Sequence, residues 1–189
     1  ISDMIKDSPP DDYGAVIAVD CADPDRLGEL TRLLQTSIPC AEIDHHESQT
    51  RLCDIVYADP GASAVGVLVY RIAHALHIPL NEPLGTCIYW AIATDTGFFS
   101  FSNSTPEALQ VCAEAIDAGA QPEKIARVMN ANSLPHQRLK GRALMKLEQH
   151  LGGQLLLSAV SPEDFEGARA ERKDTEGIVD EIRDLVVQC

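Results

Sequence analysis

Short apolar runs alternate with polar segments over the first 60 residues, in the pattern of an α/β domain. Residues 14–20 form a continuous apolar run, residues 41–46 are predicted as a short strand that ends in polar residues, and residues 52–58 are predicted as a third strand. Continuous apolarity over four to eight residues is typical of strands buried on both faces of a parallel sheet. Between the first two runs, four leucines share one face of a predicted helix of about three turns: Leu27, Leu30, Leu33 and Leu34.

The rest of the chain predicts mostly helices. These cover residues 63–77, 83–93, 106–118, 122–130 and 134–150. A strand at 154–160 and two short helices follow. The order of elements predicts an α/β fold, in which a parallel sheet is flanked by helices and is followed by linker helices and the start of a smaller α/β domain.

Composition narrows the class of protein. Of 189 residues, 45% are hydrophobic and 23% are charged, which excludes a disordered chain. No uninterrupted apolar run reaches about 18 residues, so the sequence predicts no membrane-spanning helix. The formal charge of -14 disfavours a long nucleic-acid duplex as partner, because such a surface repels a polyanion. A small phosphate-bearing molecule fits this charge better.

The six cysteines include no C-x-x-C pair, and most lie within apolar runs. We therefore expect them to be buried free thiols. The first residues, Ile1-Ser2-Asp3-Met4, lack the basic and apolar regions of a signal peptide. Together these features predict a cytoplasmic protein.

Acidic and histidine side chains follow the apolar segments at three places. Asp20 ends the first predicted strand, Asp44, His45 and His46 end the second, and Asp95 follows a very apolar helix. In parallel sheets, functional groups gather beyond the carboxyl ends of the strands. Carboxylates and imidazoles together suit a divalent metal such as Mn²⁺. The alternative, that these residues are separate caps and turn residues, stays open on spacing alone.

Several of these segments resemble the motifs of the DHH phosphoesterase superfamily. The signature itself is Ala41-Glu42-Ile43-Asp44-His45-His46. The similarity extends to residues 19–28, 58–63, 93–99 and 101–107. Their order and spacing resemble the branch that contains bacterial nano-RNases, which also dephosphorylate 3′-phosphoadenosine 5′-phosphate.

The resemblance implies a hydrolytic centre with two Mn²⁺ ions, Mg²⁺ being the alternative. It implies that Asp20 is the bridging ligand and that His45 and Asp95 bind one metal. It assigns His46 to the scissile phosphate and Asp44 to the support of the histidines. Two cations at such a centre activate the attacking water and neutralise the phosphoryl oxygens.

The chain departs from the family pattern at both ends. The family's first motif, with a histidine and two aspartates, does not precede Asp20. Ser100 stands where relatives often carry a basic residue. We expect residues 1–120 to be an N-terminally incomplete DHH domain, 121–152 to be linker helices and 153–189 to begin an incomplete C-terminal associated domain. Such a fragment is expected to be nearly inactive by itself.

The predicted function is hydrolysis of short oligoribonucleotides, linear dinucleotides or 3′-phosphoadenosine 5′-phosphate. The alternatives are a manganese pyrophosphatase or single-strand exonuclease of the same superfamily, or an inactive nucleotide-binding module. The expected partner is a short oligonucleotide or small nucleotide, with a homodimer left open. Neither a long duplex nor a membrane is expected.

Overall fold

The computed structural model describes residues 13–21, 23–35, 38–48 and 51–185. The chain divides into two compact units after Ala126. This boundary falls inside a helix, α5 (Pro122–Met129), so the predicted linker 121–152 contributes residues to both units. In the described part of the chain, no helix is both long enough and apolar enough to cross a membrane.

The first unit is built on a three-stranded parallel sheet, as the continuous apolar runs predict. Its strands are β1 (Val16–Val19), β2 (Cys40–Asp44) and β3 (Ile55–Ala58), in the order β1-β2-β3. The backbone N–H of Asp20 donates to the carbonyl of Ile43 at 3.0 Å, which extends the pairing past the end of β1. Because the strands are parallel, their carboxyl ends lie at one edge of the sheet.

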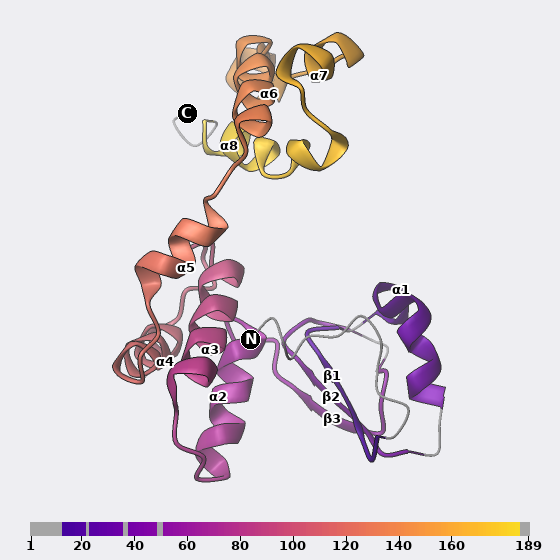
Figure 1. Cartoon of the computed structure of the whole chain (residues 1–189), viewed down its shortest axis with the longest axis vertical. Helices are drawn as coiled ribbons and strands as arrows, with labels where there is room; N and C mark the ends of the chain where they lie inside the picture. The colour runs from indigo at the N-terminus through magenta and orange to yellow at the C-terminus, as the bar shows by residue number, and fades with distance from the viewer. Residues whose placement is uncertain (1–12, 22, 36–37, 49–50, 186–189) are drawn as a thin grey trace. The chain divides into compact units, whose positions relative to one another are not determined.

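The first unit also contains α-helices and one 3₁₀ helix. They are α1 (Pro24–Leu27), the 3₁₀ helix η2 (Gly28–Gln35), α2 (Val65–Ala75), α3 (Glu82–Asp95), α4 (Pro106–Asp117) and α5. Helices α2, α3 and α4 pack against one another, and α2 also contacts β2 (Figure 1). A Cβ atom on Gly66 would lie 2.9 Å from the carbonyl oxygen of Ile88, so glycine lets α2 approach α3 closely. The core of these helices contains Leu68, Ile92 and Val111, each at most 1% exposed.

The second unit is a smaller assembly of short elements. They are α6 (Leu134–Met145), β4 (Glu148–His150), the 3₁₀ helix η3 (Leu151–Gly153), β5 (Leu155–Leu157), α7 (Pro162–Ala168), the 3₁₀ helix η4 (Arg172–Thr175) and α8 (Ile178–Asp184). Its core consists of Leu139, Ala143, Ala168 and Ile178. Short helices and strands therefore make up this unit.

The predicted helix 134–150 is wrong over its last residues. Helix α6 ends at Met145, and β4 pairs with β5 in an antiparallel hairpin. Gly152 and Gly153 have φ of +66° and +95°, in the left-handed region where glycine is not strained. The chain therefore reverses at these glycines, and the preceding residues pair with β5 instead of extending the helix.

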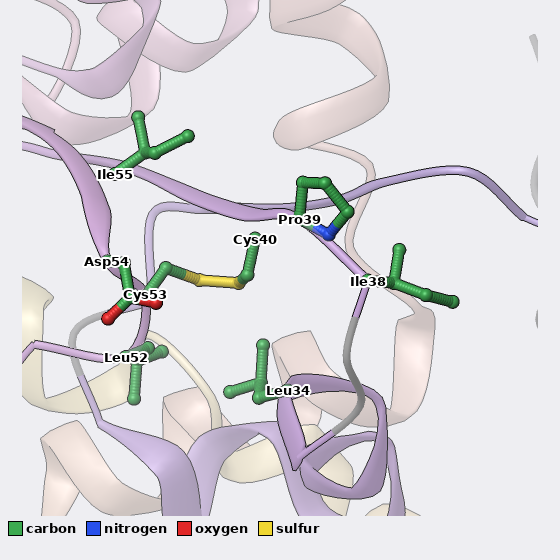
Figure 2. A pocket seen from close by; sticks show the side chains of 8 residues that line it. All are labelled: Leu34, Ile38, Pro39, Cys40, Leu52, Cys53, Asp54 and Ile55. Carbon is green, nitrogen blue, oxygen red and sulfur yellow. A yellow bond between two sulfur atoms is a disulfide. The ribbon is translucent and has the colours of Figure 1, made fainter.

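The prediction that the cysteines are buried free thiols is wrong for three of them. Cys40 and Cys53 form a disulfide with Cα atoms 5.2 Å apart, and the free thiol of Cys87 is exposed. Parallel pairing of β2 with β3 brings Cys40 close to Cys53, although 13 residues separate them. The bond borders a pocket of about 350 Å³ at the amino ends of these strands (Figure 2). Cys21 and Cys112 are buried free thiols, and Cys189 lies outside the described residues.

Candidate metal centre

Asp20 lies directly after β1, at the carboxyl edge of the sheet. Its φ of +58° places it in the left-handed region, which aspartate tolerates better than most residues. Oδ1 of Asp20 lies 3.4 Å from Nε2 of His45 and 3.7 Å from Nδ1 of His46. The backbone turn after β1 therefore places this carboxylate beside both histidines of the neighbouring strand.

His45 lies between two carboxylates. Its Nδ1 is 3.3 Å from the carbonyl oxygen of Ala62, an acceptor to which only a protonated Nδ1 can donate. A neutral imidazole in this tautomer presents the lone pair of Nε2 on its other side. Nε2 lies 3.4 Å from Oδ1 of Asp20 and 3.4 Å from Oδ2 of Asp95. Three potential ligand atoms, one nitrogen and two carboxylate oxygens, therefore meet at this point.

His46 is held by the buried carboxylate of Asp44. Oδ1 of Asp44 accepts hydrogen bonds from the backbone N–H of His46 at 2.8 Å and from its Nδ1 at 2.7 Å. Burial raises the pKa of Asp44, but the hydrogen bonds from His46 outweigh burial and leave the pKa below its usual value. Asp44 is therefore a carboxylate that orients His46 and leaves Nε2 as the free ring nitrogen.

Asp95 is the last residue of α3, and the packing of α3 brings it to the edge of the sheet. Burial raises the pKa of Asp95, and repulsion from Asp20 raises it further. The chain after Asp95 is tightly turned, since Gly97, Phe98 and Phe99 all have positive φ. Gly97 has φ of +54°, and a Cβ atom there would lie 2.6 Å from the ring of Phe101, so a larger residue would be strained and would displace that ring.

These groups fit a divalent cation. Oδ1 of Asp20 is buried and has no hydrogen-bond partner among the described residues. Asp20, His45 and His46 each offer a ligand atom, and these atoms lie within 4.8 Å of one another. Asp95 joins the group through its contact with Nε2 of His45. A divalent cation would satisfy the unpartnered oxygen and relieve the repulsion between the carboxylates of Asp20 and Asp95.

Two supporting groups were not predicted from the sequence. The carbonyl of Ala62 orients His45, and backbone carbonyls leave no signal in a sequence. Glu42 is fully buried in β2, where its carboxylate accepts from Arg51 at 2.9 Å and from the backbone N–H of Leu52 at 2.7 Å. A lone glutamate inside the apolar run 41–43 was the available signal for this buried ion pair.

The sequence has curated relatives with a shared name. It is 30% identical over 190 residues to the bifunctional oligoribonuclease and PAP phosphatase NrnA of Thermus thermophilus, a match that covers 98% of this chain and 55% of the relative. It is 29% identical over 106 residues to the protein of the same name in Bacillus subtilis, covering 53% of this chain and 33% of that relative. The chain thus spans about half the length of the first relative and a third of the second.

The fold also has a solved counterpart. The structure of an exopolyphosphatase-related protein from Bacteroides fragilis matches 93% of this chain and 52% of that protein, with a TM-score of 0.84 at 22% identity. No family model matches the chain. A parallel sheet with aspartates and histidines clustered at its carboxyl edge defines the class as an α/β protein with a candidate divalent-metal centre.

Together with the sequence motifs, these relatives support assignment of the chain to the DHH phosphoesterase superfamily.

Proposed function

We propose that this chain carries the metal-binding part of a phosphoesterase that hydrolyses short oligoribonucleotides, linear dinucleotides or 3′-phosphoadenosine 5′-phosphate. The observation that supports the proposal most directly is the position of Nε2 of His45, 3.4 Å from a carboxylate oxygen of both Asp20 and Asp95. At this position one imidazole nitrogen and two carboxylate oxygens are close enough to bind the same cation.

In this proposal Asp20, His45 and Asp95 hold the metal, and Asp20 is the bridging ligand of a two-metal centre. Two Mn²⁺ ions, or Mg²⁺ in their place, would lower the pKa of the attacking water and neutralise charge on the phosphoryl oxygens. The donor of His45 to the Ala62 carbonyl keeps Nε2 available as a ligand atom. The αL turn at Asp20 holds its carboxylate toward both histidines.

His46 is proposed to contact the scissile phosphate. Asp44 is buried and holds the ring through Nδ1, so Nε2 is the ring nitrogen that remains to contact a phosphate oxygen. Asp44 therefore acts through His46, and His46 contacts the substrate.

The charge of the first unit supports a small substrate. Residues 1–126 contain six basic and 19 acidic residues, a formal charge of -13. Arg51 is bound to Glu42, and Arg71 is bound to Asp59 and Glu107. Such a surface repels a long polyanion, whereas a compact phosphate ester needs to be neutralised only at the metal centre.

The test is a calorimetric titration of the chain with Mn²⁺. We expect binding in the wild type, loss of binding in the double variant Asp20→Ala/His45→Ala, and no change in His74→Ala, which removes an exposed histidine of α2. Equal Mn²⁺ affinity in the wild type and the double variant would overturn the proposed site.

The reaction is tested separately, by release of mononucleotide from a diadenylate and of phosphate from 3′-phosphoadenosine 5′-phosphate in the presence of Mn²⁺. Hydrolysis that survives Asp20→Ala/His45→Ala would contradict the proposed function. Mn²⁺ binding to the wild type without hydrolysis of either compound would contradict the proposed substrates and favour a nucleotide-binding module.

A further inference from the structure

Two polar side chains join the loop before α2 to the loop after α3. Oγ of Ser63 donates to the backbone carbonyl of Asn103 at 2.5 Å, and Nδ2 of Asn103 donates to the carbonyl of Ser63 at 3.1 Å. Ser63 is 1% exposed. These reciprocal hydrogen bonds, which we call the Ser63–Asn103 brace, connect positions 40 residues apart in the sequence.

Each end of the brace is adjacent to a residue of the candidate metal centre. Ala62, the neighbour of Ser63, provides the carbonyl oxygen that accepts from Nδ1 of His45. Nδ2 of Asn103 also donates to the backbone carbonyl of Asp95, at 3.0 Å. The brace therefore links the backbone that orients His45 to the backbone that carries Asp95.

The brace is anchored to a helix as well as to loops. Oγ of Ser63 lies 2.9 Å from Oγ1 of Thr105, and Oγ1 of Thr105 accepts from the backbone N–H of Ala108 at the start of α4. Ala108 is fully buried. A shift of the brace would therefore disturb the cap of a helix that packs against α2 and α3.

The metal centre needs such an external support. The carboxylates of Asp20 and Asp95 both lie 3.4 Å from Nε2 of His45, and their like charges repel each other, so they tend to separate while no cation lies between them. Hydrogen bonds to the ligands of a metal site, or to the backbone that bears them, limit this separation and keep the site ready to bind.

We infer that Ser63 and Asn103 are positioning residues of the metal centre, which hold Asp95 at binding distance from His45 and thereby set the affinity for the divalent cation. This inference rests on the proposed function, because it assumes that the centre binds a metal. Neither side chain touches the cation site. Each acts through the backbone of a neighbouring residue.

The experiment compares Asn103→Ala and Ser63→Ala with the wild type and with Asn81→Ala. Asn81 caps the opposite end of α3, where its side chain accepts from the backbone N–H of Leu84 at 3.0 Å. It is a matched control, since it also removes an asparagine side chain that hydrogen-bonds to the backbone of α3, but at the end of the helix opposite Asp95. Each variant is titrated with Mn²⁺ by calorimetry and melted without metal.

We expect both brace variants to bind Mn²⁺ about 10-fold more weakly, as is typical when a group behind a metal ligand is removed. Asn81→Ala is expected to lower the Tm without changing Mn²⁺ affinity. A second readout is the absorption spectrum of bound Co²⁺, which reports ligand geometry and should change in the brace variants alone. Because Asn103→Ala leaves buried carbonyls unpaired, Ser63→Ala serves as an independent variant if Asn103→Ala does not fold.

Unchanged Mn²⁺ affinity in the folded brace variants would overturn the inference while leaving the proposed function intact. An equal loss of affinity in Asn81→Ala would also overturn it, because the effect would then follow general stability. Absence of Mn²⁺ binding to the wild-type chain would instead overturn the proposed function, and the inference with it.

Discussion

The buried aspartates of the second unit are satisfied by hydrogen bonds, unlike Asp20 and Asp95 of the first unit. In the second unit, Asp164 accepts from the backbone N–H of Ser161 and pairs with Lys146, and Asp174 accepts from Ser133 and from the backbone N–H of Glu171. In each case hydrogen bonds lower the pKa of the carboxyl.

In the first unit, Asp20 and Asp95 lie close together, and the pKa of Asp95 is raised by burial and by Asp20. Oδ1 of Asp20 and Oδ2 of Asp44 are buried without a hydrogen-bond partner in the described part of the chain. The first unit is also much more acidic: residues 1–126 carry a formal charge of -13, whereas residues 127–189 carry -1. Satisfied carboxylates stabilise a fold, whereas crowded and unpartnered ones indicate a binding site.

The largest expected effect that separates the two units is stabilisation by metal. At Mn²⁺ concentrations about 1,000 times the Kd, the free energy of opening of the first unit should rise by about 4 kcal/mol, because only the folded site binds the ion. Hydrogen exchange of the amides in β1 and β2 measures this change. Equal protection of the amides in α6 and α7 would contradict the assignment of the site to the first unit.

Reduction of the disulfide should have the next largest effect. Breaking the bond between Cys40 and Cys53 frees a short loop, and we expect the first unit to lose about 2–3 kcal/mol of unfolding free energy. Urea unfolding with and without reductant measures the loss. Cys87→Ser is the control, since its thiol is free and exposed, and its response to reductant should equal that of the wild type. Alkylation of Cys40 and Cys53 without prior reduction would show that the bond is absent.

The smallest effect concerns the second unit and depends on pH. The pair with Lys146 and the hydrogen bond from Ser161 lower the pKa of Asp164, so its ionised form favours the folded state. This stabilisation is complete above the unfolded pKa, close to 3.8, and disappears as the pH falls through the lower folded pKa. Asp164→Asn should therefore be less stable than the wild type near pH 7.

The difference between Asp164→Asn and the wild type should disappear in strong acid, and thermal unfolding followed across this pH range measures it. Asp180→Asn is the matched control in the same unit, because its side chain is 65% exposed and should contribute little at any pH. A difference that persists unchanged at low pH would show that Asp164 stabilises α7 by shape and not by charge.

Local pattern was enough to predict the parallel sheet and most helices. The runs 14–20 and 41–46 became β1 and β2, and the helix predicted at 106–118 is α4, because periodicity reports which side chains are buried. The prediction from periodicity was wrong where the backbone conformation of a few residues turns the chain. Gly152 and Gly153 turn the chain and convert the end of a predicted helix into β4.

The candidate site also contains residues that the sequence predicted and contacts that it did not predict. Asp20 and the residues 44–46 could be predicted as polar groups at strand ends, since parallel strands bring their carboxyl ends to one edge. Asp95 was a candidate because it follows a very apolar helix, and the family motif assigned it to the same metal as His45, but nothing local to α3 indicates what its end approaches. Ser63 and Asn103 lie within the motif segments, but no pattern indicated the hydrogen bonds between them.

The sequence by itself determined which segments are buried strands and helices, and which polar residues follow them, because these properties depend on the spacing of neighbouring side chains. Tertiary structure decided the 3.4 Å approach of Asp95 to His45, the pairing of Cys40 with Cys53 and the brace that joins two loops. These contacts join positions 13 to 50 residues apart. They form only when helices pack on the sheet and when residues such as Asp20 adopt a backbone conformation that periodicity does not encode.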